Sequence, residues 1–211
     1  MPRKLRTCAF VSVFAMAGAL CFAQDFSADI VSLSGNDHIA MSKVFVSGNK
    51  AHVDMRGNEM GVSAVLVDND QHKYYLLMPP QHAYMEMPRG TTRTFALWRP
   101  TNVNDACPEW QNLMAQIHPQ EKSGTCRKVG SDTVNGRSAI KYEGTSADGQ
   151  KGQAWVDTKL RCLIKYADSE GGAELRNIQE GSQPSSLFQI PAGYQKMDMG
   201  SMMGRGMAPP Q

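Results

Sequence analysis

The sequence predicts a mainly β protein with short helices, an antiparallel curved half-barrel of about ten strands with one or two helices across its concave face. Three observations lead to this prediction. Short extended segments recur at nearly even spacing, separated by turn residues. Asn135-Gly136 lies between alternating apolar flanks, and this dipeptide suits the positive φ angles of a two-residue hairpin turn. Some segments are apolar on both faces, so part of the sheet must be covered.

The first 23 residues have the pattern of a signal peptide. Arg3, Lys4 and Arg6 form a positive region, and residues 8–20 form an apolar run that is too short to span a bilayer. Residues 21–23 (CFA) place small side chains at the −3 and −1 positions of a cleavage site. We therefore expect a periplasmic or secreted protein, with an uncleaved anchor as the alternative.

The exported chain is expected to contain one domain, residues 24–196, followed by a flexible tail rich in Met, Gly and Pro, residues 197–211. Removing the leader takes away three basic and no acidic residues, so the formal charge of +2 becomes −1. A near-neutral chain without a basic run is not expected to bind nucleic acid. No transmembrane segment is expected after cleavage of the leader.

The expected strands form two groups, separated by a break. The first group comprises residues 26–33, 38–46, 51–56, 61–67, 73–78 and 82–87. The second group comprises residues 126–133, 137–145, 153–157, 161–167 and 173–179. Only one face of segment 51–56 is apolar, whereas both faces of 62–67 and 74–78 are. These last two segments require a cover.

The break between the two groups supplies the candidate cover. One stripe of an amphipathic helix is formed by Trp110, Leu113, Met114 and Ile117. Asp105 is a plausible N-cap, and Pro108 is compatible with the first turn. Another helical turn or two is expected over residues 94–99. We predict that the stripe lies on the concave face of the sheet.

The cysteines predict one disulfide. Cys8 and Cys21 leave with the leader, and Cys107, Cys126 and Cys162 enter an oxidising compartment. Cys107 and Cys126 flank the predicted helix, and closing this loop stabilises the fold by roughly 3 kcal/mol in the chain-entropy model. Cys162 lies in a strand-like apolar run, which favours a buried free thiol over participation in a bridge.

Four segments resemble the lipoprotein-carrier (LolA/LolB-like) superfamily, and within it a group of poorly characterised secreted bacterial proteins. They are residues 43–50 (KVFVSGNK), 154–160 (AWVDTKL), 174–178 (ELRNI) and 187–194 (LFQIPAGY). The resemblance extends over nearly the whole exported chain, but every one of these motifs specifies structure and none supplies chemistry. It implies a half-barrel that binds acyl chains or other apolar ligands in its concavity.

The expected ligand site is an apolar groove between sheet and helix. Its candidate lining residues are Val62, Leu66, Tyr75 and Leu77 together with Trp110, Leu113, Met114 and Ile117. The competing outcome is a core at normal packing density, in which the same side chains contact one another. A lipid or another hydrophobic small molecule is the expected partner, and the sequence does not identify a protein partner.

Nothing in the sequence predicts an enzyme or a cofactor. Ser63 lacks the second glycine of a nucleophile elbow, and the usual metalloprotease and phosphate-loop motifs are missing. His52 shares a strand face with Asp54, and His82 shares one with Glu86, so a metal site between strands is geometrically possible. Solvated strand histidines are the favoured interpretation.

The C-terminal methionines predict an alternative function. Five of them fall within the last fifteen residues: Met197, Met199, Met202, Met203 and Met207. Thioether ligands suit Cu(I), so the alternative is a periplasmic copper-binding protein that uses this tail. The surrounding Gly, Ser and Pro residues are also typical of a low-complexity tail in which methionine is incidental.

Overall fold

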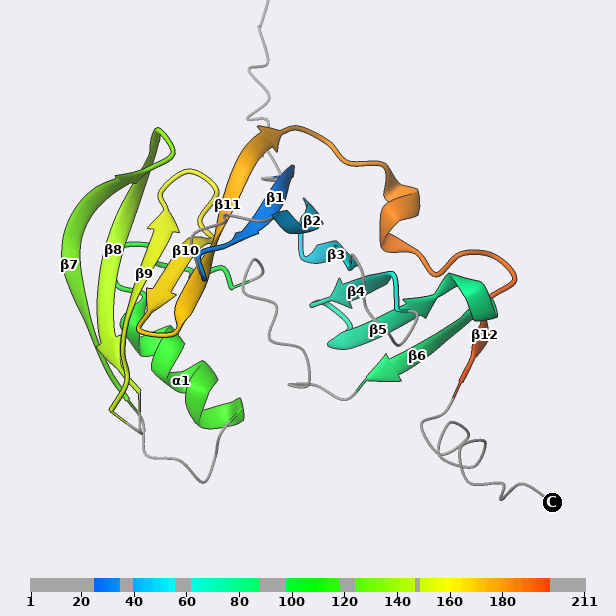
Figure 1. Cartoon of the computed structure of the whole chain (residues 1–211), viewed down its shortest axis with the longest axis horizontal. Helices are drawn as coiled ribbons and strands as arrows, with labels where there is room; N and C mark the ends of the chain where they lie inside the picture. Colours follow the sequence, from blue (N-terminus) through cyan, green and yellow to red (C-terminus); the bar gives the residue numbers. More distant parts are fainter. Residues whose placement is uncertain are drawn as a thin grey trace, which may run out of the picture.

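The computed structural model describes residues 25–34, 40–55, 62–87, 98–117, 124–146 and 149–197. Within these ranges the chain forms one open, largely antiparallel sheet of 12 strands and one α-helix (Figure 1). The predicted fold class is therefore confirmed. The predicted leader and most of the predicted tail lie outside the described residues.

The strands follow the expected segments closely. The first half of the chain contains β1 (Phe26–Ser32), β2 (Ala40–Ser47), β3 (Lys50–Met55), β4 (Ala64–Asp68), β5 (Lys73–Met78) and β6 (Ala83–Met87). The second half contains β7 (Thr125–Val134), β8 (Arg137–Thr145), β9 (Lys151–Asp157), β10 (Leu163–Asp168), β11 (Gly171–Glu180) and β12 (Gln195–Lys196).

The sheet consists of two hairpin series joined at their centre. Its strand order is β12-β6-β5-β4-β3-β2-β1-β11-β10-β9-β8-β7, so β1 pairs with β11 instead of leading into one continuous meander. The twelfth strand was not predicted. It is two residues long and pairs in parallel with β6, and so short a strand carries no alternation that a sequence could reveal.

The pairing register divides the sheet into two faces, because residues paired across strands point the same way. We call inner the face that includes Tyr142, Ala154, Tyr166, Leu175, Ile30, Val44, Val53, Val65, Leu76 and Met85. We call outer the face that includes Trp155, Lys165, Glu174, Lys43, Asp54, His52, Leu66, Tyr75, Leu77 and Tyr84.

The helix α1 (Cys107–Ile117) lies on the inner face, and Figure 1 shows the sheet curving around it. The entry to α1 is anchored at Tyr142, whose hydroxyl donates to the Val103 carbonyl at 2.7 Å and accepts from the Ala106 N–H at 3.2 Å. Ala106 is fully buried against Ile140 and the neighbouring strands. The helix therefore covers the β8–β10 side of the sheet.

Two short 3-10 helices complete the described structure: η1 (Pro79–Gln81) between β5 and β6, and η3 (Ser185–Phe188) after β11. The additional helical turn expected over residues 94–99 falls mostly outside the described residues, and Trp98 and Arg99 are not helical. The main core packs the valines of β2, β3 and β4 with Phe26, Leu160, Ile164 and Leu175.

Candidate functional site

The inner face is apolar from β8 to β6, and it is not fully closed. Among the described residues, three large apolar side chains are prominently exposed: Met55 (37%), Tyr166 (36%) and Val129 (46%). The register places Met55 beside Val53 and Tyr166 opposite Ala154, so both belong to the inner face. Apolar surface therefore remains accessible on the face that carries α1.

The predicted strand residues of the groove divide between the two faces. Leu66 pairs with Tyr75 and Leu77 pairs with Tyr84, which places them on the outer face, away from α1. Val62 instead packs with residues of β5 and β6, among them Met78, Ala83 and Met85. The described structure thus does not bring this set together with the helix in one groove. The apolar residues on both faces of segments 62–67 and 74–78 predicted that both faces are covered. They could not show that the outer cover is the C-terminal segment and not the helix.

The predicted helix stripe lies next to the inner face. Trp110 is half-buried and meets Trp98 edge-on, with ring centroids 5.3 Å apart and planes at 71°. Trp98 in turn packs against the buried cluster of β8, β9 and β10. Leu113 and Met114 are half-buried, and the side chain of Ile117 lies outside the described residues.

The outer face of β4, β5 and β6 is covered by the C-terminal segment. Ile190 and Tyr194 pack on Leu66, Leu77 and neighbouring side chains, and Figure 1 shows this segment running along the outside of the curved sheet. A pocket of about 240 Å³ lies along its edge. Its lining residues are Lys50, Leu66, Val67, Asp68, Gln71, Tyr75, Phe188, Gln189 and Ile190. The positively charged side chain in this lining, Lys50, forms an ion pair with Asp68, with its Nζ 3.1 Å from the carboxylate.

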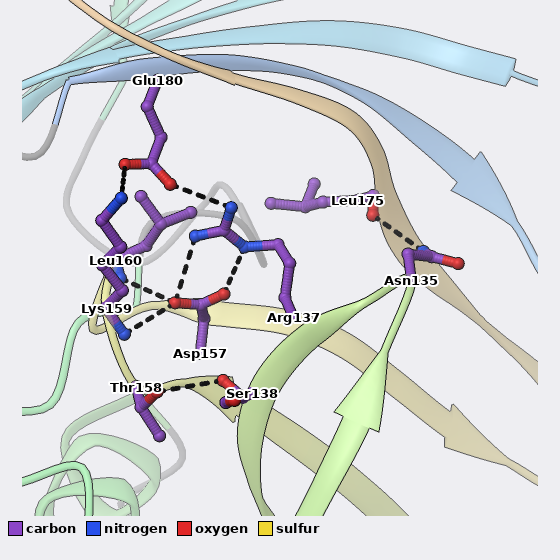
Figure 2. A network of polar contacts seen from close by, with 9 residues as sticks. All are labelled: Asn135, Arg137, Ser138, Asp157, Thr158, Lys159, Leu160, Leu175 and Glu180. Carbon is purple, nitrogen blue, oxygen red and sulfur yellow. Dashed lines mark hydrogen bonds and ion pairs between the residues drawn. The ribbon is translucent and has the colours of Figure 1, made fainter.

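A second polar region gathers between the β8–β9 pair and β11 (Figure 2). Asp157 is almost fully buried and accepts from the Arg137 Nε at 2.5 Å. Its other oxygen accepts from the backbone N–H groups of Lys159 and Leu160, at 2.8 and 2.7 Å. The Arg137 Nη1 lies 2.9 Å from a carboxylate oxygen of Glu180, whose other oxygen lies 2.6 Å from the Lys159 Nζ.

The charges of this cluster neutralise one another. Hydrogen bonding from Lys159 lowers the pKa of the Glu180 carboxyl, and Arg137 acts in the same direction. Burial alone would lower the pKa of Arg137, but hydrogen bonds to Asp157 and Glu180 outweigh it and raise that pKa. Both shifts favour the charged forms of Arg137 and Glu180, and the cluster fastens the β9–β10 turn to the sheet.

The cysteines confirm the predicted pairing. Cys107 and Cys126 form a disulfide with a Cα–Cα distance of 5.5 Å, which ties the start of α1 to β7. Cys162 is a free thiol with no exposed surface. Burial raises the pKa of this thiol to about 12, so it stays protonated and unreactive.

The candidate metal ligands that the structure describes are three histidines, His52, His72 and His82, and one tail methionine, Met197. Within the described ranges, no three His, Cys, Asp or Glu side chains lie close enough together to hold a metal ion. Met197 packs against the apolar cluster of β5 and β6. The other tail methionines, Met199, Met202, Met203 and Met207, lie outside the described residues.

Two features of the site were missed by sequence reasoning. The first is the ring of His52, which bridges Asp54 and the carbonyl of Leu187. The second is the clustering of Arg137 and Glu180 around Asp157. The turn at residues 157–159 lies within the AWVDTKL motif, which indicates a fold, but no local pattern indicates the partners of Asp157 in β8 and of Lys159 in β11.

No protein-family model and no curated protein matches the sequence. Solved structures resemble it in fold at low identity. PNGF-II in a P21 crystal form superimposes with a TM-score of 0.52 at 9% identity, over 86% of this chain and 33% of that one, so the chain spans one third of that protein. An uncharacterised conserved protein of Thermus thermophilus superimposes with a TM-score of 0.49 at 7% identity, and the match covers 83% of this chain and 91% of that one. A LolA superfamily protein of Nitrosomonas europaea superimposes with a TM-score of 0.32 at 11% identity, and the match covers 79% of this chain and 90% of that one.

Proposed function

We propose that this chain is an exported, non-enzymatic binding protein that holds an acyl chain or another apolar ligand against the inner face of its sheet. The observation that carries the proposal is the exposure of Met55 and Tyr166 on the one face that is otherwise apolar across the strands. Ligand pockets are lined predominantly by apolar side chains, and these two side chains leave apolar surface open on that face. The resemblance of residues 43–50 and 187–194 to the lipoprotein carriers supports the same function.

Export is supported by the point at which the fold begins. Cleavage after Ala23 would leave Asp25 as the second residue, and Asp25 already belongs to the domain. Its carboxylate accepts from the Ser47 hydroxyl at 2.8 Å and from the Gly48 N–H at 2.9 Å. The Cys107–Cys126 disulfide is typical of an oxidising compartment. Among the described residues, no helix is long and apolar enough to cross a membrane.

The test compares lysine substitutions at the two exposed inner-face residues with one at an exposed residue far from them. In Met55→Lys and Tyr166→Lys, a charge is placed against the bound apolar chain, where its desolvation is unfavourable. Val129→Lys is the matched control: Val129 is also exposed, but it lies at a bulge in β7, the edge strand farthest from β12. All three sites tolerate a charge in the free protein because they reach solvent.

The measurement is native mass spectrometry of freshly purified exported chain, followed by solvent extraction and lipid analysis. We expect bound apolar ligand in the wild type and in Val129→Lys, and a several-fold lower occupancy in both inner-face variants. Wild-type protein without any apolar ligand, together with no uptake of a fluorescent fatty acid, would contradict the proposal. Bound copper that disappears on removal of residues 198–211 would instead support the metal-binding alternative.

A further inference from the structure

The C-terminal segment forms a separate layer on the outer face of the sheet. After β11 the chain passes through η3, packs Ile190 and Tyr194 on the outer face, and pairs as β12 with the edge of β6. At that edge the Gln195 N–H donates to the His82 carbonyl at 2.9 Å and the Met197 N–H donates to the Tyr84 carbonyl at 2.8 Å. We call residues 185–197 the strap.

One side chain fastens the start of the strap to the sheet. The His52 Nδ1 lies 2.6 Å from the Leu187 carbonyl oxygen, and its Nε2 lies 2.8 Å from the Asp54 Oδ1. The side chain of His52 is only 11% exposed, and its ring packs edge-on against Phe45 at 5.8 Å. Both nitrogens therefore have one fixed partner each.

Both partners of the ring are hydrogen-bond acceptors. A carbonyl oxygen and a carboxylate oxygen have no proton to donate, whereas a neutral imidazole donates from one nitrogen and accepts at the other. The observed arrangement is satisfied only when both ring nitrogens carry a proton. A neutral ring would leave one nitrogen lone pair facing an oxygen lone pair at less than 3 Å.

We propose that His52 is a proton-dependent latch: the doubly protonated ring holds the strap on the outer face, and loss of one proton loosens it. Histidine is the side chain that ordinarily changes charge between about pH 5 and pH 8. The strap is therefore held firmly at the acidic end of this range and released more often at the alkaline end. Release uncovers the apolar outer surface formed by Leu66, Tyr75, Leu77 and Tyr84.

The described charged groups around the latch lie on β2, β3 and β4. On β3 itself, Asp54 is the direct partner and Lys50 is paired with Asp68 of β4. On β2, the Lys43 Nζ lies over the ring of Phe45, 5.4 Å from its centroid. The η3 helix that receives the second hydrogen bond, residues 185–188 (SSLF), has no charged side chain. The two groups in direct contact with the ring are thus a carboxylate on one side and a backbone carbonyl on the other.

A second histidine touches the far end of the strap and must be separated from the first. The ring of His82 stacks on Tyr194, with centroids 6.0 Å apart and planes at 11°. Lys196 also forms an ion pair with Glu86, with its Nζ 2.9 Å from the carboxylate. Neither contact requires a proton on His82, so His82→Gln is the matched control for His52→Gln.

Asp54→Asn tests whether the second ring proton of His52 is what the latch requires. An asparagine amide can donate to the Nε2 while a neutral ring still donates from Nδ1 to Leu187, so both partners are satisfied without the extra proton. This variant is expected to keep the strap closed across the whole pH range. His52→Gln does not titrate and is expected to show a strap whose mobility no longer depends on pH.

The experiment is NMR of the purified exported chain between about pH 5.5 and pH 8.0, the range in which histidine ordinarily titrates. Ring 15N shifts report how many protons His52 carries, and the Ile190 methyl group reports how often the strap detaches. In the wild type we expect two ring protons at the acidic limit and about a tenfold larger detached population at the alkaline limit, the effect of losing one hydrogen bond to a charged group. His82→Gln should behave like the wild type.

Three results would overturn the latch. A His52 ring with one proton at the acidic limit would remove its premise. Strap mobility that does not change with pH in the wild type would show that the protonation of His52 does not control the strap. If the pH dependence of strap mobility is lost in His82→Gln and retained in His52→Gln, the titrating group is His82 and not His52. Native mass spectrometry of bound ligand does not depend on any of these outcomes.

Discussion

Replacing Asp157 by alanine is expected to destabilise the protein more than any other single change to a charged residue described above. Asp157 is 1% exposed and accepts from Arg137 and from the backbone N–H groups of Lys159 and Leu160. In Asp157→Ala, the two N–H groups lose their partner and Arg137 retains only Glu180. The turn that follows β9 would keep its hydrogen bonds from Thr158 to the Ser138 carbonyl but lose every contact with the Asp157 carboxylate.

The magnitude follows from these contacts. Breaking a buried pair by removing one partner costs about 3–5 kcal/mol, because the remaining charge and donors stay desolvated. Arg137 is 21% exposed on its side chain and can partly rehydrate, so we expect the lower half of that range, about 3–4 kcal/mol. Glu143→Ala provides the control. Glu143 pairs with the largely exposed Arg127, and such surface pairs contribute about 0–1 kcal/mol.

The assay is urea unfolding followed by far-UV circular dichroism, with the disulfide intact in all variants. A loss of less than about 1 kcal/mol in Asp157→Ala, equal to that of the surface control, would refute the reasoning. It would mean that water reaches the cluster and that the buried contacts do not hold the turn.

Four further results are expected. Joint replacement of Cys107 and Cys126 by serine should lower the free energy of unfolding by about 3 kcal/mol, and non-reducing peptide mapping should find their crosslinked peptide as the major species. Cys162 should react with a thiol reagent at about pH 8 only as fast as the protein unfolds, because its pKa is about 12. Trp110→Asp should cost about 2–3 kcal/mol in thermal unfolding, since it places a charge against the inner face. Stability should fall as the pH drops below about 4.5, because the folded pKa of Glu180 is lowered; in Glu180→Gln this acid dependence should be weaker.

Local patterns predicted the strands, the helix and the disulfide. Alternation and turn residues identified eleven strands near their observed positions, and the stripe that includes Trp110 identified α1. The pairing of Cys107 with Cys126 followed from their positions on either side of that helix. Each of these features is determined by residues close together in the chain, which is why periodicity and spacing were sufficient.

The arrangement of the site depended on long-range pairing that no local pattern contains. The register puts Leu66 and Leu77 on the outer face, under a strap that ends in a two-residue strand. Sequence alternation shows that a strand is covered on both sides, but it cannot assign one cover to α1 and the other to residues 185–197. The His52–Leu187 contact, across 135 positions of the chain, was invisible for the same reason.

The central claim, ligand binding on the inner face, is tested most directly by tryptophan quenching with a brominated fatty acid. Trp155→Phe keeps only Trp110, which belongs to α1, and Trp98, which packs against it. The variant with both of these replaced by Phe keeps only Trp155, which lies on the outer face between Lys141 and Lys165. We predict strong, saturable quenching in the first variant and little in the second. Equal quenching in both, or quenching of Trp155 alone, would contradict a ligand held on the inner face.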